Sequence, residues 1–190
     1  MRNSERRSEA PARGTINGHV VFLKGVNVGG NNVFRPKQCA EALSHLDVVN
    51  VGAAGTFVVR ARATTTAIKK EFLAQLPFEP VIALTTAAEL MRFVQSAPFG
   101  PKTRPTGVRW WVAVLAANTK AQPELPIGMP AGKTWSVRMD AIDGRFAIGH
   151  WRRRPGGFVI PNQVVEKALG VPATVRWWET FERIAKVIEA

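Results

Sequence analysis

The sequence predicts an α+β protein of two ferredoxin-like lobes, each with a split βαβ arrangement and mixed or antiparallel strands. First, residues 19–97 give the order strand, helix, strand, strand, helix, strand that ferredoxin-like domains share. Second, Pro and Gly interrupt regular structure at 98–107, which we interpret as a connector between lobes. Third, residues 108–190 carry further strand and helix signals and end in an amphipathic helix. Residues 1–18 are expected to form a disordered basic tail.

The strands and helices of the first lobe are predicted from its apolar runs and from the residues that interrupt them. The β-branched and apolar runs predict strands, whereas apolar residues at spacings of three and four predict helices. Thr86 and Glu89 have the spacing of a capping box, which favours a helix start. The expected elements are a strand at 20–26, a helix at 36–46, strands at 48–51 and 57–59, a helix from 64–66 to 76, a strand at 81–84 and a helix from 86.

The second lobe begins with the clearest strand of this half, at 108–115. Its neighbouring Trp110 and Trp111 must face opposite sides of a regular strand, so one of them should lie in the core. A Pro-rich loop follows, and Asp-Gly within Asp140–Gly144 favours a hairpin turn there. The expected elements are a hairpin of 134–139 with 145–151, a helix from 161 to 169, a strand at 173–176 and a terminal helix at 179–188 that packs on the second lobe.

The charge balance favours polyanionic partners. The chain has 26 Lys and Arg against 14 Asp and Glu, a formal net charge of +12 and a pI near 11.1. Such a charge attracts polyanions over long range, and binding releases their counterions. Two segments are candidate anion-facing loops: the acid-free span 101–122 with Arg104 and Arg109, and the run Arg152, Arg153 and Arg154.

Cysteine usage and hydropathy point to the cytoplasm. The single cysteine, Cys39, cannot form an intramolecular disulfide, and its place in a predicted helix favours a buried, unreactive thiol. No apolar run approaches the roughly 20 residues needed to cross a bilayer, so no membrane partner is expected. The first 18 residues lack the apolar stretch of a signal peptide.

A cation in the first apolar strand marks one candidate site. Lys24 must extend to solvent, pair with a carboxylate or meet a ligand. The following Asn- and Gly-rich loop can present backbone N–H groups to an anion. We therefore hypothesise a site for an anion or polar ligand at Lys24, Asn27, Gly29, Gly30 and Asn31. The alternatives are a structural salt bridge at Lys24 and an ordinary tight turn, because the loop has neither dinucleotide-binding nor phosphate-loop spacing.

A second candidate site combines cations with aromatic rings. Arg176, Trp177 and Trp178 can form a stacking platform for a nucleobase, or they can lock the terminal helix onto a sheet. If the arginines near 138–154 share a face with Trp135 or Trp151, nucleic-acid binding is favoured. The predicted nucleic-acid-binding residues are Arg152, Arg153, Arg154, Arg176 and Trp178.

Two segments carry a family resemblance. Residues 20–30, VVFLKGVNVGG, and 169–180, LGVPATVRWWET, resemble domain-of-unknown-function family 1697, whose members open with a strand followed by Arg-Gly-Ile-Asn-Val-Gly-Gly. Lys24 replaces the family's Arg. Where members carry Tyr-x-Gln-Ser-Gly-Asn, this chain has Val-Gly-Ala-Ala-Gly-Thr at 51–56. The resemblance implies the fold but no activity, because the family has none established.

These observations favour a non-enzymatic module that binds nucleic acid or another polyanion. One alternative is a small-molecule enzyme using the loop after the first strand, and another is self-association as a homo-oligomer or a protein-interaction module. The three histidines, His19, His45 and His150, show no metal-ligand spacing, and no serine lies in a nucleophile-elbow motif. We predict no metal, no cofactor and no catalytic motif.

Overall fold

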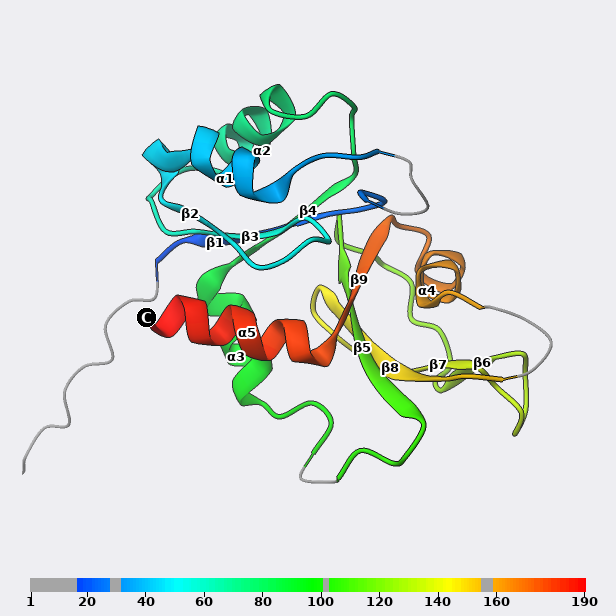
Figure 1. Cartoon of the computed structure of the whole chain (residues 1–190). Coiled ribbons are helices and arrows are strands. Elements are labelled where there is room, and N and C mark those ends of the chain that lie inside the picture. Colours follow the sequence, from blue (N-terminus) through cyan, green and yellow to red (C-terminus); the bar gives the residue numbers. More distant parts are fainter. Residues whose placement is uncertain (1–16, 28–31, 101–102, 155–158) are drawn as a thin grey trace, which may run out of the picture.

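The structure is a computed structural model that describes residues 17–27, 32–100, 103–154 and 159–190 (Figure 1). Its two antiparallel sheets stand at an angle to each other, with helices between them and on their outer sides. The α+β class is therefore confirmed. The expected tail falls almost entirely outside the described residues.

The first sheet has the predicted ferredoxin-like topology. Its strands lie in the order β2-β3-β1-β4, and all neighbours are antiparallel. Thr64 and Thr86 fix the starts of α2 and α3, because each hydroxyl accepts a hydrogen bond from a backbone N–H three residues on. The elements are β1 (His19–Leu23), α1 (Pro36–Ala42), a short 3-10 helix (Ser44–Leu46), β2 (Val48–Asn50), β3 (Thr56–Val59), α2 (Thr65–Ala74), β4 (Ile82–Thr86) and α3 (Ala87–Gln95).

The second sheet has the order β6-β7-β8-β5-β9 and is also antiparallel. Without its edge strand β6, this order repeats that of the first sheet. The repeat departs from the ferredoxin-like pattern between β5 and β7, where the Pro-rich connection forms β6 instead of a helix. The elements are β5 (Val108–Leu115), β6 (Ile127–Met129), β7 (Val137–Asp143), β8 (Phe146–Arg152), α4 (Pro161–Leu169), β9 (Ala173–Trp177) and α5 (Trp178–Glu189).

The β7–β8 hairpin corrects one sequence expectation. The turn was expected over Asp140–Gly144, but β7 runs on to Asp143 and the turn lies at Gly144–Arg145. The register shifts between Met139 and Ala141, so Asp140 occupies a β-bulge inside the strand. Asp140 is therefore held by the sheet and belongs to no turn.

The terminal helix packs differently from the expectation. Instead of covering the second lobe alone, α5 lies beside α3 between the two sheets and contacts strands of both (Figure 1). Phe181 of α5 stacks on Phe22 of β1, with ring centroids 5.8 Å apart, and meets Phe146 of β8 edge-on at 6.2 Å. The central core thus joins the two sheets through these aromatic rings.

Two outer cores complete the molecule. On the first sheet, α1 and α2 cover the face away from the centre, and Cys39 is buried there. Burial raises the pKa of the Cys39 thiol to about 11, as expected for an unreactive cysteine. On the second sheet, α4 covers the outer face, where Trp111 is fully buried, whereas Trp110 faces inward and is half-buried. One of the two tryptophans is core, as predicted.

Candidate polyanion-binding surface

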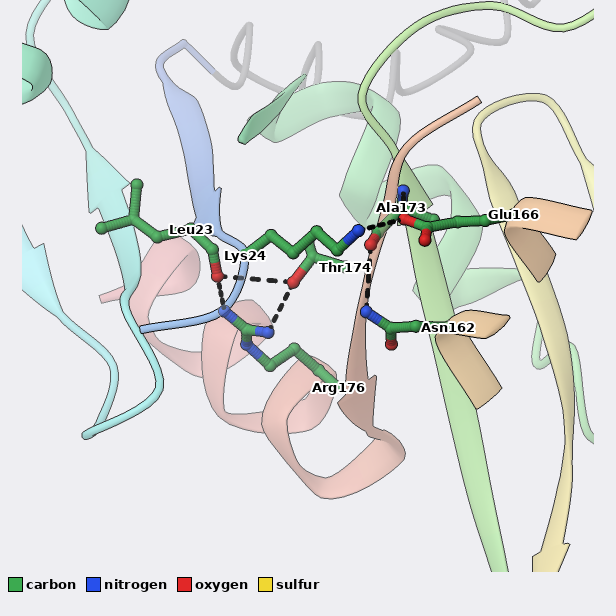
Figure 2. Close-up of polar contacts among 7 residues, drawn as sticks. All are labelled: Leu23, Lys24, Asn162, Glu166, Ala173, Thr174 and Arg176. Atoms are coloured by element: carbon green, nitrogen blue, oxygen red, sulfur yellow. Dashed lines mark hydrogen bonds and ion pairs between the residues drawn. The ribbon is translucent and has the colours of Figure 1, made fainter. Parts of the chain in front are cut away.

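Lys24 pairs with a carboxylate from the second lobe. It follows β1, and its Nζ lies 2.5 Å from Oε1 of Glu166 on α4 (Figure 2). The same oxygen accepts a hydrogen bond from the backbone N–H of Ala173 at 2.7 Å, and Asn162 donates to the carbonyl of Ala173 at 3.1 Å. Lys24 therefore has the geometry of the structural salt bridge, and it links the lobes across 142 residues of sequence.

The loop after Lys24 also uses its polar atoms internally where it is described. Asn27 has a positive φ of 54°; its amide N–H donates to the carbonyl of Ala53, and its oxygen accepts from the N–H of Phe34. These bonds fit the tight-turn alternative. Gly29, Gly30 and Asn31 lie outside the described residues, so a ligand site in this loop stays a prediction.

Arg176 is a buried structural lock at the junction of the lobes. Only 8% of it is exposed, and burial lowers the pKa of its guanidinium to about 10. Its donors point at the end of β1 (Figure 2). They also reach the turn before β3. The acceptors are the hydroxyls of Thr56 and Thr174 and the carbonyls of Leu23, Ala54, Gly55 and Val175.

The structure does not bring Arg176 and Trp178 together with the other predicted nucleic-acid-binding residues. Trp178 opens α5 and packs against Phe93, Phe99 and Phe181 in the centre of the molecule. Its half-buried ring and the buried Arg176 therefore fit the alternative in which these residues hold the terminal helix against a sheet. The arginine run lies at the end of β8 instead.

Arg152 is held over the ring of Trp135. Its guanidinium carbon lies 3.8 Å from the ring centroid, and its nitrogens donate to the carbonyls of Trp135 and Lys133. Arg138 approaches the same ring at 4.9 Å. Desolvation and the charges of Arg154 and Arg138 lower the pKa of Arg152. Arg138 and Arg152 therefore meet at Trp135, whereas Arg145 lies elsewhere and donates to the carbonyl of Leu115, so the arginines near 138–154 do not all share a face.

A groove of about 560 Å³ lies where the connector meets β5 and the end of β8. It is lined by Arg104, Arg109, Arg153 and Trp151, together with connector residues 105–107 and Val108 of β5. We call it the arginine groove. Its cations are Arg104 in the connector, Arg109 on β5 and Arg153 after β8. The fold therefore brings together positive charges from two distant segments of the chain.

Strand pairing builds the wall of the arginine groove. Arg109 on β5 pairs directly with Trp151 on β8, and Trp111 pairs with Trp177 on β9. Because alternate residues share a face, Arg109, Trp151 and Trp177 lie together on the outer face. The guanidinium of Arg109 lies 3.7 Å from the ring centroid of Trp177, and Trp151 meets that ring edge-on at 5.9 Å. The tryptophan rings therefore fix the direction of the cation.

One carboxylate opposes the positive charge. Glu179, near the start of α5, forms an ion pair with Arg104. Burial on its own would raise the pKa of Glu179, but its hydrogen bond to its own backbone N–H and the charges of Arg104 and Arg109 lower it overall. At neutral pH Glu179 is therefore ionised and partly neutralises the groove. Sequence reasoning missed this pair, because 75 residues separate its members.

The described residues contain no group of three or more His, Cys, Asp or Glu side chains placed to hold a metal ion. In the same part of the chain, no helix has both the length and the apolar character needed to cross a membrane.

Comparison with known proteins identifies the fold and the family. The chain resembles a conserved bacterial protein, SP0830 from Streptococcus pneumoniae, with a TM-score of 0.59 and 14% sequence identity over 92% of this chain and 99% of that chain. At this identity the likeness shows the fold alone. No curated protein matches the sequence. The model of a family described as a protein of unknown function, DUF1697, matches residues 16–139, about two thirds of the chain, and the chain therefore belongs to the DUF1697 family.

Proposed function

We propose that this protein is a non-enzymatic module that binds nucleic acid or another polyanion through the arginine groove. The observation that carries the proposal is the convergence of Arg104, Arg109 and Arg153 around one groove beside Trp151. Guanidinium groups bind phosphate through paired N–H donors, and this geometry makes arginine well suited to phosphate recognition.

The surrounding charge supports the proposal. Arg153 and Arg154 are exposed just after β8. A net charge of +12 adds long-range attraction for any polyanion. Phosphate contacts of this kind carry affinity without reading sequence, so binding should tolerate many base sequences.

A flexible single strand is the nucleic acid that we expect the groove to bind. Its tryptophans are half-buried, and Arg109 lies over the ring of Trp177, so stacking surface is limited. Backbone contacts therefore dominate the expected interaction. A single strand, which can bend into a short groove, is the favoured nucleic acid.

The test is fluorescence anisotropy at low salt with labelled single-stranded RNA, single-stranded DNA and heparin. The variant Arg109→Gln with Arg153→Gln removes two groove cations. The control, Lys37→Gln with Lys70→Gln, removes the same charge from exposed positions on α1 and α2. We expect the groove variant to weaken binding at least about tenfold and the control to change it less than about twofold.

Circular dichroism must show that both variants keep the native fold. Equal weakening by the groove variant and the control would leave only diffuse attraction and contradict the proposed site. An absence of binding to all three polyanions at low salt would contradict the function itself.

A further inference from the structure

A separate pocket lies between the connector and the inner face of the second sheet. It measures about 250 Å³ and is bounded by residues of β5, β7 and β8 and by the described part of the connector. Phe99 and Trp110 form its aromatic wall, with their rings stacked at 4.7 Å and an interplanar angle of 3°. Arg138, Asp140 and His150 supply its polar side. Such a mixture of an apolar wall and a few grouped polar atoms is typical of small-molecule sites.

The bulge in β7 places the central carboxylate of this polar side. Asp140 lies between the two registers of the strand, and its Oδ2 is 2.6 Å from Nδ1 of His150 on β8. Its other oxygen accepts a hydrogen bond from Nε of Arg138 at 2.5 Å. Both carboxylate oxygens are therefore engaged, and they orient the imidazole and the guanidinium together.

The polar atoms left over in the pocket are mostly donors. Within the described residues, the terminal nitrogens of Arg138, which are donors, have no hydrogen-bond partner. The indole N–H of Trp110 is buried without a partner in the same part of the chain. A buried donor that lacks an acceptor costs free energy, and a bound acceptor would recover it. These groups favour an anion or another acceptor-rich group.

We propose that this pocket binds a small aromatic ligand that carries one anionic group, a carboxylate or a phosphate. A cavity of about 150 Å³ holds a benzene ring, so about 250 Å³ accommodates one ring and its substituent. The ring packs against Phe99 and Ile148, and the anionic group meets Arg138, with the ring of His150 beside it. Asp140 is a positioning residue, which holds both of these groups. This site is independent of the arginine groove.

The test uses benzoate, phenyl phosphate and inorganic phosphate as probes, followed by proton–carbon NMR of the histidine rings. The chain has three histidines, so His45→Gln and His150→Gln assign the peaks. His45 is a matched control, because its Nε2 pairs with Glu71 at 3.5 Å in the first lobe, outside the pocket. We expect an aromatic probe to shift the His150 peak saturably while the His45 peak stays in place.

Binding of the aromatic probe should weaken at least about tenfold in Arg138→Gln and remain unchanged in Arg109→Gln with Arg153→Gln. Preference for benzoate identifies a carboxylate ligand, and preference for phenyl phosphate identifies a phosphate ligand. Equal binding of inorganic phosphate would overturn the requirement for a ring. Equal shifts of the His45 and His150 peaks, or no saturable shift with either aromatic probe, would overturn the pocket. The titration of the wild-type protein tests the pocket even if a variant does not fold.

Discussion

At the residue scale, the same kind of side chain serves opposite purposes according to burial. Arg176 and Arg153 were both predicted to bind nucleic acid, yet Arg176 is 8% exposed and saturated with internal acceptors, whereas Arg153 is exposed in the arginine groove. Their sequence surroundings, each next to a tryptophan or another arginine, do not separate them. Four of the six acceptors of Arg176, at Leu23, Ala54, Gly55 and Thr56, lie 120 or more residues away, so only the fold reveals its role.

The lock formed by Arg176 predicts a large loss of stability on substitution. Arg176→Met leaves buried carbonyls and hydroxyls without a donor, and we expect the free energy of unfolding to fall by about 3 kcal/mol. Urea denaturation measures this change. The control Arg62→Met, at an exposed arginine with no internal hydrogen bond in the described residues, should stay within about 0.5 kcal/mol of the wild type. Equal effects of the two substitutions would contradict the lock.

The raised pKa of the Cys39 thiol predicts that it is alkylated slowly. Its pKa rises from 9.0 to about 11 in the folded protein, so at pH 8 its thiolate fraction is about a hundredfold lower than that of an exposed thiol. Alkylation by iodoacetamide should therefore be at least that much slower in the native protein than in urea. Similar rates in both conditions would show that the thiol is accessible and ionised.

At the element scale, the first lobe was predictable because its signals are local. The hydroxyls of Thr64 and Thr86 cap their helices, and the apolar runs before and after them form the expected strands. The second lobe was harder to predict from its sequence. Strand β6 has only three residues, and proline at 126 and 130 hides it among loop signals. The bulge at Asp140 was also missed, because Asp-Gly nearby indicates a turn on its own.

Close packing of β8 against β7 and β5 predicts the effect of a single added methyl group. A Cβ atom on Gly149 would lie 2.0 Å from the carbonyl oxygen of Arg138 and 2.5 Å from the buried ring of Trp111. Gly149→Ala must therefore move a strand or the ring, and we expect a loss of about 1 to 3 kcal/mol in the free energy of unfolding. Thermal denaturation monitored by tryptophan fluorescence measures it. A variant as stable as the wild type would contradict the packing of Trp111.

At the scale of the whole molecule, the two lobes are joined into one body, and the arginine groove lies on the second of them. The central aromatic core, the Lys24–Glu166 ion pair and Arg176 join the lobes, and α5 lies across the junction. The total charge predicts a polyanion partner, which stays a prediction, but it does not predict where the charges lie on the surface. Arg109 meets Trp151 only through the pairing of β5 with β8, which no local pattern specifies.

The groove contains its own opposing charge, and this predicts a gain of affinity. Glu179→Gln frees Arg104 and removes one negative charge from the groove, so polyanion binding should strengthen about two- to fivefold. Anisotropy with single-stranded RNA at low salt measures the change. The wild type should also bind more tightly as the pH falls through the pKa of Glu179, and the variant should lack that component. Unchanged affinity in the variant would place the nucleic acid away from Arg104.

The salt dependence of RNA binding tests the central claim most directly. For a single strand, the slope of log K against log salt changes by about 0.7 for each phosphate contact. We predict that Arg109→Gln with Arg153→Gln makes this slope shallower by about 1.4, whereas Lys37→Gln with Lys70→Gln leaves it unchanged. Identical slopes for the wild type and the groove variant would contradict binding through the arginine groove.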